Sequence, residues 1–294
     1  MTAGLSAGRT LRGIAYAALG AVAPGAVSRW ATDVFSDTRA LRIRPDNLLP
    51  IGAARFSVEN CPDSPSGYLW GERSAAGTAL LVHGWASDSS SMHPLVGPMR
   101  DLGFTVAAFD APAHGVRAGS QATMSQYADA VGAVLDTLGD VRVVVAHSLG
   151  TIAAIAAAAA RGAPLDCLVL ISPTCTLAGV LERWDGAGLR LSSATVDGIR
   201  RELHRRNGVP VTHWDAVGLG RSLECPVLAI HDPDDPMVPY TDAETVVAGL
   251  SEARLERAPG EGHLAILVSR HVRALVSAFV AEHTADRRGG RTRL

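Results

Sequence analysis

Fully apolar runs alternate with helix-like segments from residue 68 onward, and this alternation constrains the fold more than any other feature. The runs show no regular polar alternation, which is typical of strands covered on both faces. Parallel strands need crossover connections, and the helix-like segments supply them. The pattern therefore predicts an α/β fold with a mostly parallel central sheet and helices on both faces. The apolar runs lie within residues 78–85, 104–115, 141–148, 165–172 and 225–232.

The rest of the chain is organised around this core. The segments ARFSVEN and GYLWGER precede it and predict two strands that form an antiparallel edge. The alternation stops at about residues 173–222, which are helix-like and charged, and we expect a small helical cap there, over the strand ends. We expect an N-terminal extension over residues 1–50, one α/β domain over residues 51–285 that carries the cap, and a basic disordered tail over residues 286–294.

The N-terminal extension contains a short apolar stretch behind arginines, which resembles a signal peptide. Pro24 and Gly25 interrupt this stretch, no clean Ala-x-Ala cleavage site follows, and the stretch is short for a membrane span. Val27, Trp30 and Val34 recur at helical spacing, which favours an amphipathic helix that covers part of the core or contacts a membrane surface. We expect a packed helix and a cytoplasmic protein, with membrane-peripheral and exported proteins as the alternatives.

Composition argues against several classes of partner. The formal net charge of -2 gives no electrostatic reason to expect nucleic acid. No GxGxxG or GxxxxGK[ST] motif is present, so we expect no nucleotide cofactor. The cysteines show no CxxC pair and no metal-like spacing with histidine, so we expect reduced core thiols and no metal. They are Cys61, Cys167, Cys175 and Cys225. The sequence does not indicate an oligomeric state.

The segment VVVAHSLGTIAA, residues 143–154, places a polar pair at the end of a buried strand. Ser148 lies where this strand meets the next helix, and ligands of open α/β sheets bind at such strand ends. Ala146 and Gly150 flank it, as a sharp strand-to-helix turn requires. The helix also points its N-terminus, with free N–H groups, at this place. Ser148 is therefore either a nucleophile or a helix N-cap, and this segment alone does not choose.

A serine nucleophile needs a base, and the base needs a third group that orients it. His263 lies in a glycine-containing loop after the last strand, and a neutral histidine is the natural base near pH 7. Three carboxylates, Asp232, Asp234 and Asp235, follow an earlier strand. The order serine, aspartate, histidine is the one expected for this kind of sheet.

With these motifs in this order, the sequence resembles the α/β-hydrolases over roughly residues 65–285. The motifs are LLVHGW, FDAPAHG, AHSLG, DDPMVP and GEGH. The resemblance implies the α/β-hydrolase fold and a serine-nucleophile, esterase- or lipase-like member. It implies that the acid is Asp235, four residues before Pro239, and that the catalytic histidine is His263. The other two aspartates are then expected to be turn formers or solvated loop carboxylates.

The resemblance also implies an oxyanion hole made by the backbone N–H groups of Trp85 and Leu149. The indole of Trp85 is expected either to line the acyl pocket or to pack under the cap. We expect His83 to bond loop backbone behind this hole. We expect His147 to point away from Ser148 and pack beneath the turn.

Gly84 and Gly150 are the small residues expected to support the site. The sequence departs from the family in one loop, where Ala113 replaces a frequent glycine and Val116-Arg117 replaces a common serine. These departures weaken a subfamily assignment and leave the proposed chemistry unchanged.

From this reading we expect a serine hydrolase that cleaves carboxylic esters of small to medium hydrophobic substrates through an acyl-enzyme. Serine at the turn argues against dehalogenases and epoxide hydrolases, which attack through a carboxylate. Thioesterase, amidase, carbon–carbon hydrolase and perhydrolase activities use the same groups and stay open. A ligand-binding or signalling protein with slow turnover and a membrane-peripheral lipase also stay open.

Overall fold

The computed structural model describes residues 23–39, 49–58, 66–184, 186 and 191–289. Its centre is an eight-stranded sheet in the order β1-β2-β4-β3-β5-β6-β7-β8. The first two strands pair antiparallel at one edge, as expected, and the other six run parallel. The strands are β1 (Ala53–Ser57), β2 (Ser66–Trp70), β3 (Thr78–Val82), β4 (Thr105–Phe109), β5 (Val141–His147), β6 (Cys167–Ile171), β7 (Val227–His231) and β8 (Ala253–Arg257).

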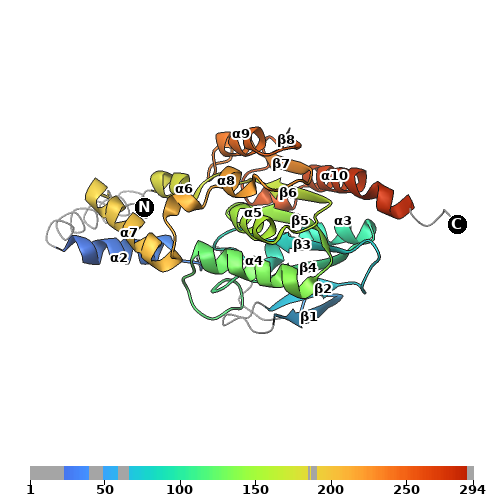
Figure 1. Ribbon diagram of the computed structural model, residues 1–294, viewed down its shortest axis with the longest axis horizontal. Coiled ribbons are helices and arrows are strands. Elements are labelled where there is room, and N and C mark those ends of the chain that lie inside the picture. Colours follow the sequence, from blue (N-terminus) through green and yellow to red (C-terminus); the bar gives the residue numbers. More distant parts are fainter. Residues whose placement is uncertain (1–22, 40–48, 59–65, 185, 187–190, 290–294) are drawn as a thin grey trace, which may run out of the picture.

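Helices cover both faces of the sheet, as expected (Figure 1). Side chains of one strand alternate between two apolar clusters: Leu80 and Val82 of β3 belong to one cluster, and Ala79 and Leu81 to the other. The first cluster includes residues of α4 (Met124–Leu138), α5 (Gly150–Arg161), α8 (Ala216–Gly220) and α9 (Tyr240–Gly249). The second includes residues of the 3-10 helices η1 (Ser89–Leu95) and η3 (Ala265–Leu267) and of α3 (Val96–Asp101) and α10 (Arg270–Gly289). Because both faces are buried, the central strands need no polar alternation.

The expected cap region contains α6 (Leu177–Arg183), α7 (Ser193–Asn207) and η2 (Val211–His213), followed by α8. Of these, α8 packs against α5 of the central domain and does not belong to the cap layer. The N-terminal helix α2 (Pro24–Phe35) lies along α7, at one end of the molecule (Figure 1). We refer to α6, α7 and α2 together as the cap, and this group includes a helix from the expected N-terminal extension.

Close approach joins α2 to α7. The hydroxyl of Ser28 lies 3.4 Å from the carbonyl oxygen of Thr195, and a Cβ atom at Gly198 would collide with that hydroxyl. Asp33 and Arg206 form an ion pair with an N–O distance of 2.6 Å at the other end of the contact. Small side chains therefore bring the two helices together and an ion pair fixes their register.

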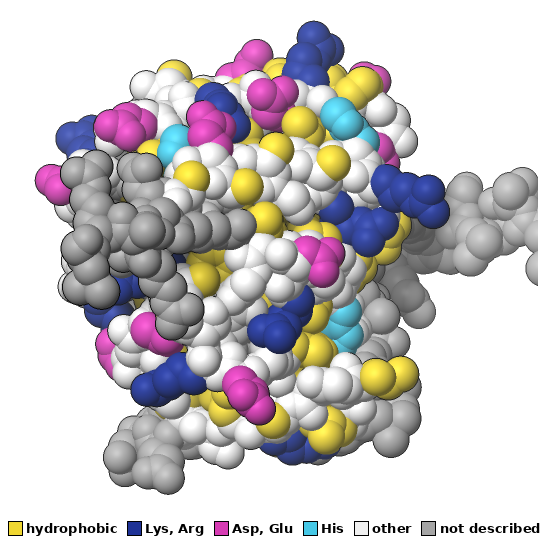
Figure 2. Space-filling model, turned by 90° about the vertical axis from the view of Figure 1, so that its right-hand side faces the viewer, with side chains coloured by type: hydrophobic (Ala, Val, Ile, Leu, Met, Phe, Trp, Pro, Cys, Tyr) yellow, Lys and Arg dark blue, Asp and Glu magenta, His cyan; other side chains and the backbone are white. Residues whose placement is uncertain are grey.

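The two ends of the chain are only partly within the described residues. The apolar stretch that resembles a signal peptide falls largely on residues 1–22, outside the described residues. At the other end α10 extends to Gly289, and residues 290–294 of the expected tail lie outside the described residues. None of the helices that the structure describes could span a membrane. Figure 2 shows basic and acidic side chains interspersed with hydrophobic ones on one face, as on an ordinary solvated surface.

Candidate active site

Ser148 follows the last residue of β5 and has a left-handed backbone conformation, with φ of +53°. This conformation is rare for residues other than glycine and turns the chain sharply into α5. The first cap position of α5 belongs to Leu149, and no side chain caps this helix. Ser148 is therefore not the helix N-cap that the sequence left open.

Two glycines permit the close packing around this turn. A Cβ atom at Gly150 would collide with the carbonyl oxygen of His83. A Cβ atom at Gly84 would lie 2.8 Å from Nδ1 of His147 and 3.1 Å from Cβ of Ser148. The turns that follow β3 and β5 therefore touch, and only residues without side chains fit between them.

The structure brings together Ser148, Asp235 and His263, which lie apart in the sequence. Nε2 of His263 lies 3.0 Å from Oγ of Ser148, and Nδ1 of His263 lies 2.7 Å from Oδ2 of Asp235. All three side chains are almost fully buried. Both distances are within hydrogen-bond reach, as proton transfer between a nucleophile and its base requires.

Asp235 is held by more groups than His263. Its Oδ1 accepts hydrogen bonds from the backbone N–H groups of Met237 (2.8 Å) and Val238 (3.0 Å), and its Oδ2 lies 3.3 Å from Nε2 of His231. Burial raises the pKa of Asp235, but the hydrogen bonds from His231, His263 and Val238 outweigh it and hold the pKa well below its usual range. Asp235 is therefore a carboxylate at neutral pH. The sequence analysis missed His231, although it ends the strand that leads to Asp235.

Asp232 differs from the solvated carboxylate that the sequence analysis allowed. Its side chain is buried and accepts hydrogen bonds from the backbone N–H groups of Asp234 (3.0 Å), Gly260 (3.2 Å) and Gly262 (2.5 Å). Burial raises the pKa of Asp232, and these three bonds lower it further than burial raises it. Asp232 is thus a turn former that also anchors the loop immediately before His263. Asp234 is exposed, as expected.

His147 does not simply pack beneath the turn, as the sequence analysis expects. Its Nε2 lies 2.9 Å from the carbonyl oxygen of His263, and the two rings have centroids 4.9 Å apart. Burial, with the nearby His263 ring, lowers the pKa of His147 to about 3. The ring is therefore neutral, Nε2–H donates to the carbonyl, and His147 supports the backbone of His263 directly.

A cavity of about 630 Å³ opens beside these groups and is lined by Gly84, Trp85, Ser148, Leu149 and His263, among others. The backbone N–H groups of Trp85 and Leu149 donate no hydrogen bond to any residue in the described part of the chain. Free N–H groups beside a serine hydroxyl can stabilise an oxyanion.

The side chains of His83 and Trp85, beside this cavity, form hydrogen bonds with loop backbone. Nδ1 of His83 lies 2.7 Å from the carbonyl oxygen of Gly84, and its Nε2 accepts from the N–H of Ala111 at 3.1 Å, so His83 bonds loop backbone as expected. The indole of Trp85 donates to the carbonyl of Asp37 at 3.0 Å. Trp85 thus lines the cavity and is also tied to the segment that follows α2.

Ala113, which replaces a frequent glycine of the family, has a left-handed backbone conformation. Its φ is +61°, a conformation in which glycine carries no penalty, which accounts for the frequent glycine in the family. The carbonyl of Ala113 accepts a hydrogen bond of 2.6 Å from Thr38, and Arg39 bonds the carbonyls of Gly115 and Arg117. The segment after α2 therefore braces this loop.

Within the described residues no group of three or more histidine, cysteine or acidic side chains could hold a metal ion. Cys167, Cys175 and Cys225 are free and buried, and burial raises the pKa of each thiol, that of Cys175 to about 11. Cys61 lies outside the described residues.

Comparisons with known proteins agree with this architecture. A family model for the alpha/beta hydrolase fold matches residues 80–213. The esterase Est1E of Butyrivibrio proteoclasticus, solved with ferulic acid bound, is 17% identical with a TM-score of 0.62, over 80% of this chain and 99% of that one. The esterase Pf2001 of Pyrococcus furiosus is 18% identical with a TM-score of 0.60, over 84% and 95%. Naproxen esterase of Bacillus subtilis is 15% identical with a TM-score of 0.58, over 79% and 93%.

The comparison with curated protein sequences gives no significant match. At these identities the similarity to solved structures indicates only the fold. The family model and the strand order agree with that fold. The chain therefore has the α/β-hydrolase fold.

Proposed function

We propose that the protein is a serine hydrolase that cleaves carboxylic esters of small to medium hydrophobic substrates through an acyl-enzyme. The observation that carries this proposal is the continuous chain of contacts from Asp235 to His263 (2.7 Å) and from His263 to Ser148 (3.0 Å). Two unpaired backbone N–H groups beside the serine complete the set of groups that acyl transfer needs.

In the first step, Oγ of Ser148 attacks the ester carbonyl carbon while Nε2 of His263 takes the hydroxyl proton. The carbonyl oxygen becomes an oxyanion that accepts hydrogen bonds from the N–H groups of Trp85 and Leu149. The tetrahedral intermediate then collapses, the carbon–oxygen bond to the alcohol breaks, and His263 gives its proton to the leaving alkoxide. The acyl group remains on Ser148.

In the second step, His263 takes a proton from water, whose oxygen attacks the acyl carbon. Collapse of this intermediate returns the proton to Oγ of Ser148 and releases the carboxylic acid. Throughout, Asp235 keeps the proton of the histidine on Nδ1 and stabilises the imidazolium that forms. Its own lowered pKa keeps Asp235 ionised for this role.

The comparisons support an ester as substrate at the level of analogy. The similar structures include an esterase with ferulic acid bound and a naproxen esterase, both at under 20% identity. The cavity of about 630 Å³ falls within the range of about 300–1,000 Å³ that small-molecule sites usually have.

Hydrolysis of p-nitrophenyl butyrate by the full chain tests the proposal. We expect turnover in the wild type and a loss of at least about 10⁴-fold in kcat in Ser148→Ala, because loss of the nucleophile leaves only the oxyanion hole and substrate binding. The matched control is Ser57→Ala, which removes an exposed hydroxyl on β1, far from the site. Turnover that is equal in the wild type and Ser148→Ala, or absent from the wild type with every ester, overturns the proposal.

A further inference from the structure

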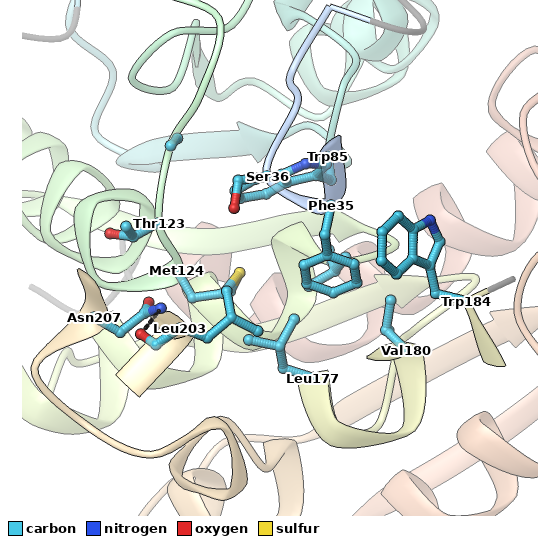
Figure 3. Close-up of a pocket in the computed structure, with 12 residues that line it drawn as sticks. Phe35, Ser36, Trp85, Thr123, Met124, Leu177, Val180, Trp184, Leu203 and Asn207 are labelled. Atoms are coloured by element: carbon cyan, nitrogen blue, oxygen red, sulfur yellow. Dashed lines mark hydrogen bonds between the residues drawn. The ribbon is translucent and has the colours of Figure 1, made fainter. Parts of the chain in front are cut away.

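A second pocket of about 160 Å³ lies beside the catalytic cavity (Figure 3). Both share four lining residues: Trp85, Leu149, Val180 and Trp184. Trp85 and Leu149 carry the N–H groups of the proposed oxyanion hole. The second pocket therefore begins where the carbonyl of a bound ester would lie.

The walls of this pocket come mainly from the cap. Phe35 ends α2, and its ring packs edge-on against the indole of Trp184, which follows α6, with ring centroids 5.2 Å apart. Leu177 and Leu203 extend from α6 and α7, and Met124 is the first residue of α4 (Figure 3). The pocket is thus enclosed where the three cap helices meet the central domain.

The pocket offers almost no polar group to a ligand. The amide of Asn207 donates to the carbonyl of Leu203 at 2.8 Å and accepts from the N–H of Ser125 at 3.2 Å. The hydroxyl of Thr123 accepts from the N–H of Gln126 at 3.1 Å. Buried polar groups that are already bonded leave an apolar surface, so the pocket favours a hydrocarbon group.

The positions of the catalytic groups tell the two sides of an ester apart. The leaving alcohol must lie next to Nε2 of His263, which protonates it. His263 lines the larger cavity together with the exposed side chains of Met237 and Leu264, and it does not line the second pocket. The alcohol side of the substrate therefore faces the open cavity. The acyl side extends from the oxyanion hole in the other direction, into the second pocket.

We propose that this pocket holds the acyl group of the substrate, and that Phe35, which packs on Trp184 beside the entrance, limits its width. The inference rests on the proposed function and names the substrate class of the same site. A pocket of about 160 Å³ suits a short hydrocarbon chain. The protein is then selective for short, unbranched acyl chains and tolerant of different alcohols. The selecting residue comes from the N-terminal helix and not from the central domain.

The test is kcat/KM for p-nitrophenyl esters from acetate to dodecanoate and for the branched pivalate ester. We expect the wild type to prefer butyrate and hexanoate. Phe35→Ala widens the pocket, and we expect the ratio of pivalate to butyrate to rise about tenfold or more, the size of effect that one or two methylenes have in an apolar pocket. Val180→Phe narrows the entrance, and we expect the ratio of hexanoate to acetate to fall about tenfold. The second variant tests the pocket even if Phe35→Ala loosens α2.

Phe56→Ala is the matched control, because it removes the same ring from β1, which lines neither pocket. We expect its chain-length profile to match the wild type. Ratios unchanged in both Phe35→Ala and Val180→Phe, with ester turnover intact, overturn this inference and leave the proposed function standing. Equal changes in the control also overturn it. Absence of ester turnover, or turnover that survives Ser148→Ala, instead overturns the proposed function.

Discussion

Replacing Asp235 by asparagine tests how the site controls the proton of His263. Oδ1 of Asp235 accepts from the N–H groups of Met237 and Val238 at 2.8 and 3.0 Å. In Asp235→Asn the amide oxygen must keep this position, because an NH₂ group there would face two donors. The NH₂ group therefore faces His263, at the place where Oδ2 now lies 2.7 Å from Nδ1.

This orientation fixes the wrong tautomer of the histidine. An amide donor requires Nδ1 of His263 to accept, so its proton moves to Nε2, which then cannot take the proton of Ser148. We expect kcat to fall about 10⁴-fold, equivalent to about 5 kcal/mol of transition-state stabilisation. KM for p-nitrophenyl butyrate should stay within a few-fold, because the carboxylate does not line the cavity.

The assay is steady-state hydrolysis of p-nitrophenyl butyrate, with circular dichroism to confirm that the variant is folded. Asp234→Asn is the matched control, because it makes the same chemical change at the neighbouring, exposed side chain. We expect this control to keep wild-type activity. A folded Asp235→Asn that retains a tenth or more of the wild-type kcat would refute the assignment of Asp235 as the orienting acid.

Three further predictions concern the groups around the site. Asp232→Asn sets an NH₂ group among three backbone donors, including the N–H of Gly262, and should lower the unfolding free energy by about 1–3 kcal/mol at pH 7. The folded pKa of Asp232 is lowered, so the extra stability of the wild type is present above about pH 4 and shrinks as the pH falls below that value. Urea unfolding above and below about pH 4 measures this difference. His147 has a folded pKa of about 3 and an ordinary value of 6.5, so the unfolded chain binds its proton first as pH falls. Between pH 7 and pH 5 the wild type should lose about 2 kcal/mol more stability than His147→Phe in urea unfolding, and equal losses contradict the neutral ring. Gly198→Ile should collide with Ser28 and displace α2. The ratio of pivalate to butyrate turnover should then rise about tenfold, as in Phe35→Ala, and an unchanged ratio would show that α2 does not shape the acyl pocket.

The fold and the meeting of Ser148, Asp235 and His263 at one edge of the sheet could be predicted from sequence patterns. Buried strands show as unbroken apolar runs, and the turn at Ser148 requires small neighbours within two positions. Asp235 and His263 lie at the ends of later strands, and parallel strands bring those ends to one edge of the sheet. The choice of Asp235 over the two neighbouring aspartates came from the family resemblance and not from the spacing.

The role of Asp232 was not predictable, because its three backbone donors include two from a loop 28 and 30 residues away. From sequence alone, a carboxylate in a loop is predicted to be solvated, because its backbone donors are not known. The structure of the cap was hidden for a similar reason. The helical spacing at Val27, Trp30 and Val34 indicates an apolar face, whereas the buried face of α2 also includes Ser28 and Thr32.

These two hydroxyls bond carbonyls one turn earlier in the same helix, at 2.9 and 2.8 Å, so they can be buried without an external partner. A polar residue of this kind is satisfied by its own helix, and sequence periodicity counts it as exposed. The acyl pocket was unpredictable in turn, because it exists only once α2 lies on α7.

The contact between Ser28 and Thr195 joins positions 167 residues apart, and this separation has a consequence during synthesis. At about 5–20 residues per second, a ribosome needs roughly ten to thirty seconds to make the intervening chain. A twelve-residue helix is marginal on its own in water, so α2 waits for that time without the surface that stabilises it. The contact between α2 and α7 in the cap therefore forms late, after most strands of the sheet have been synthesised.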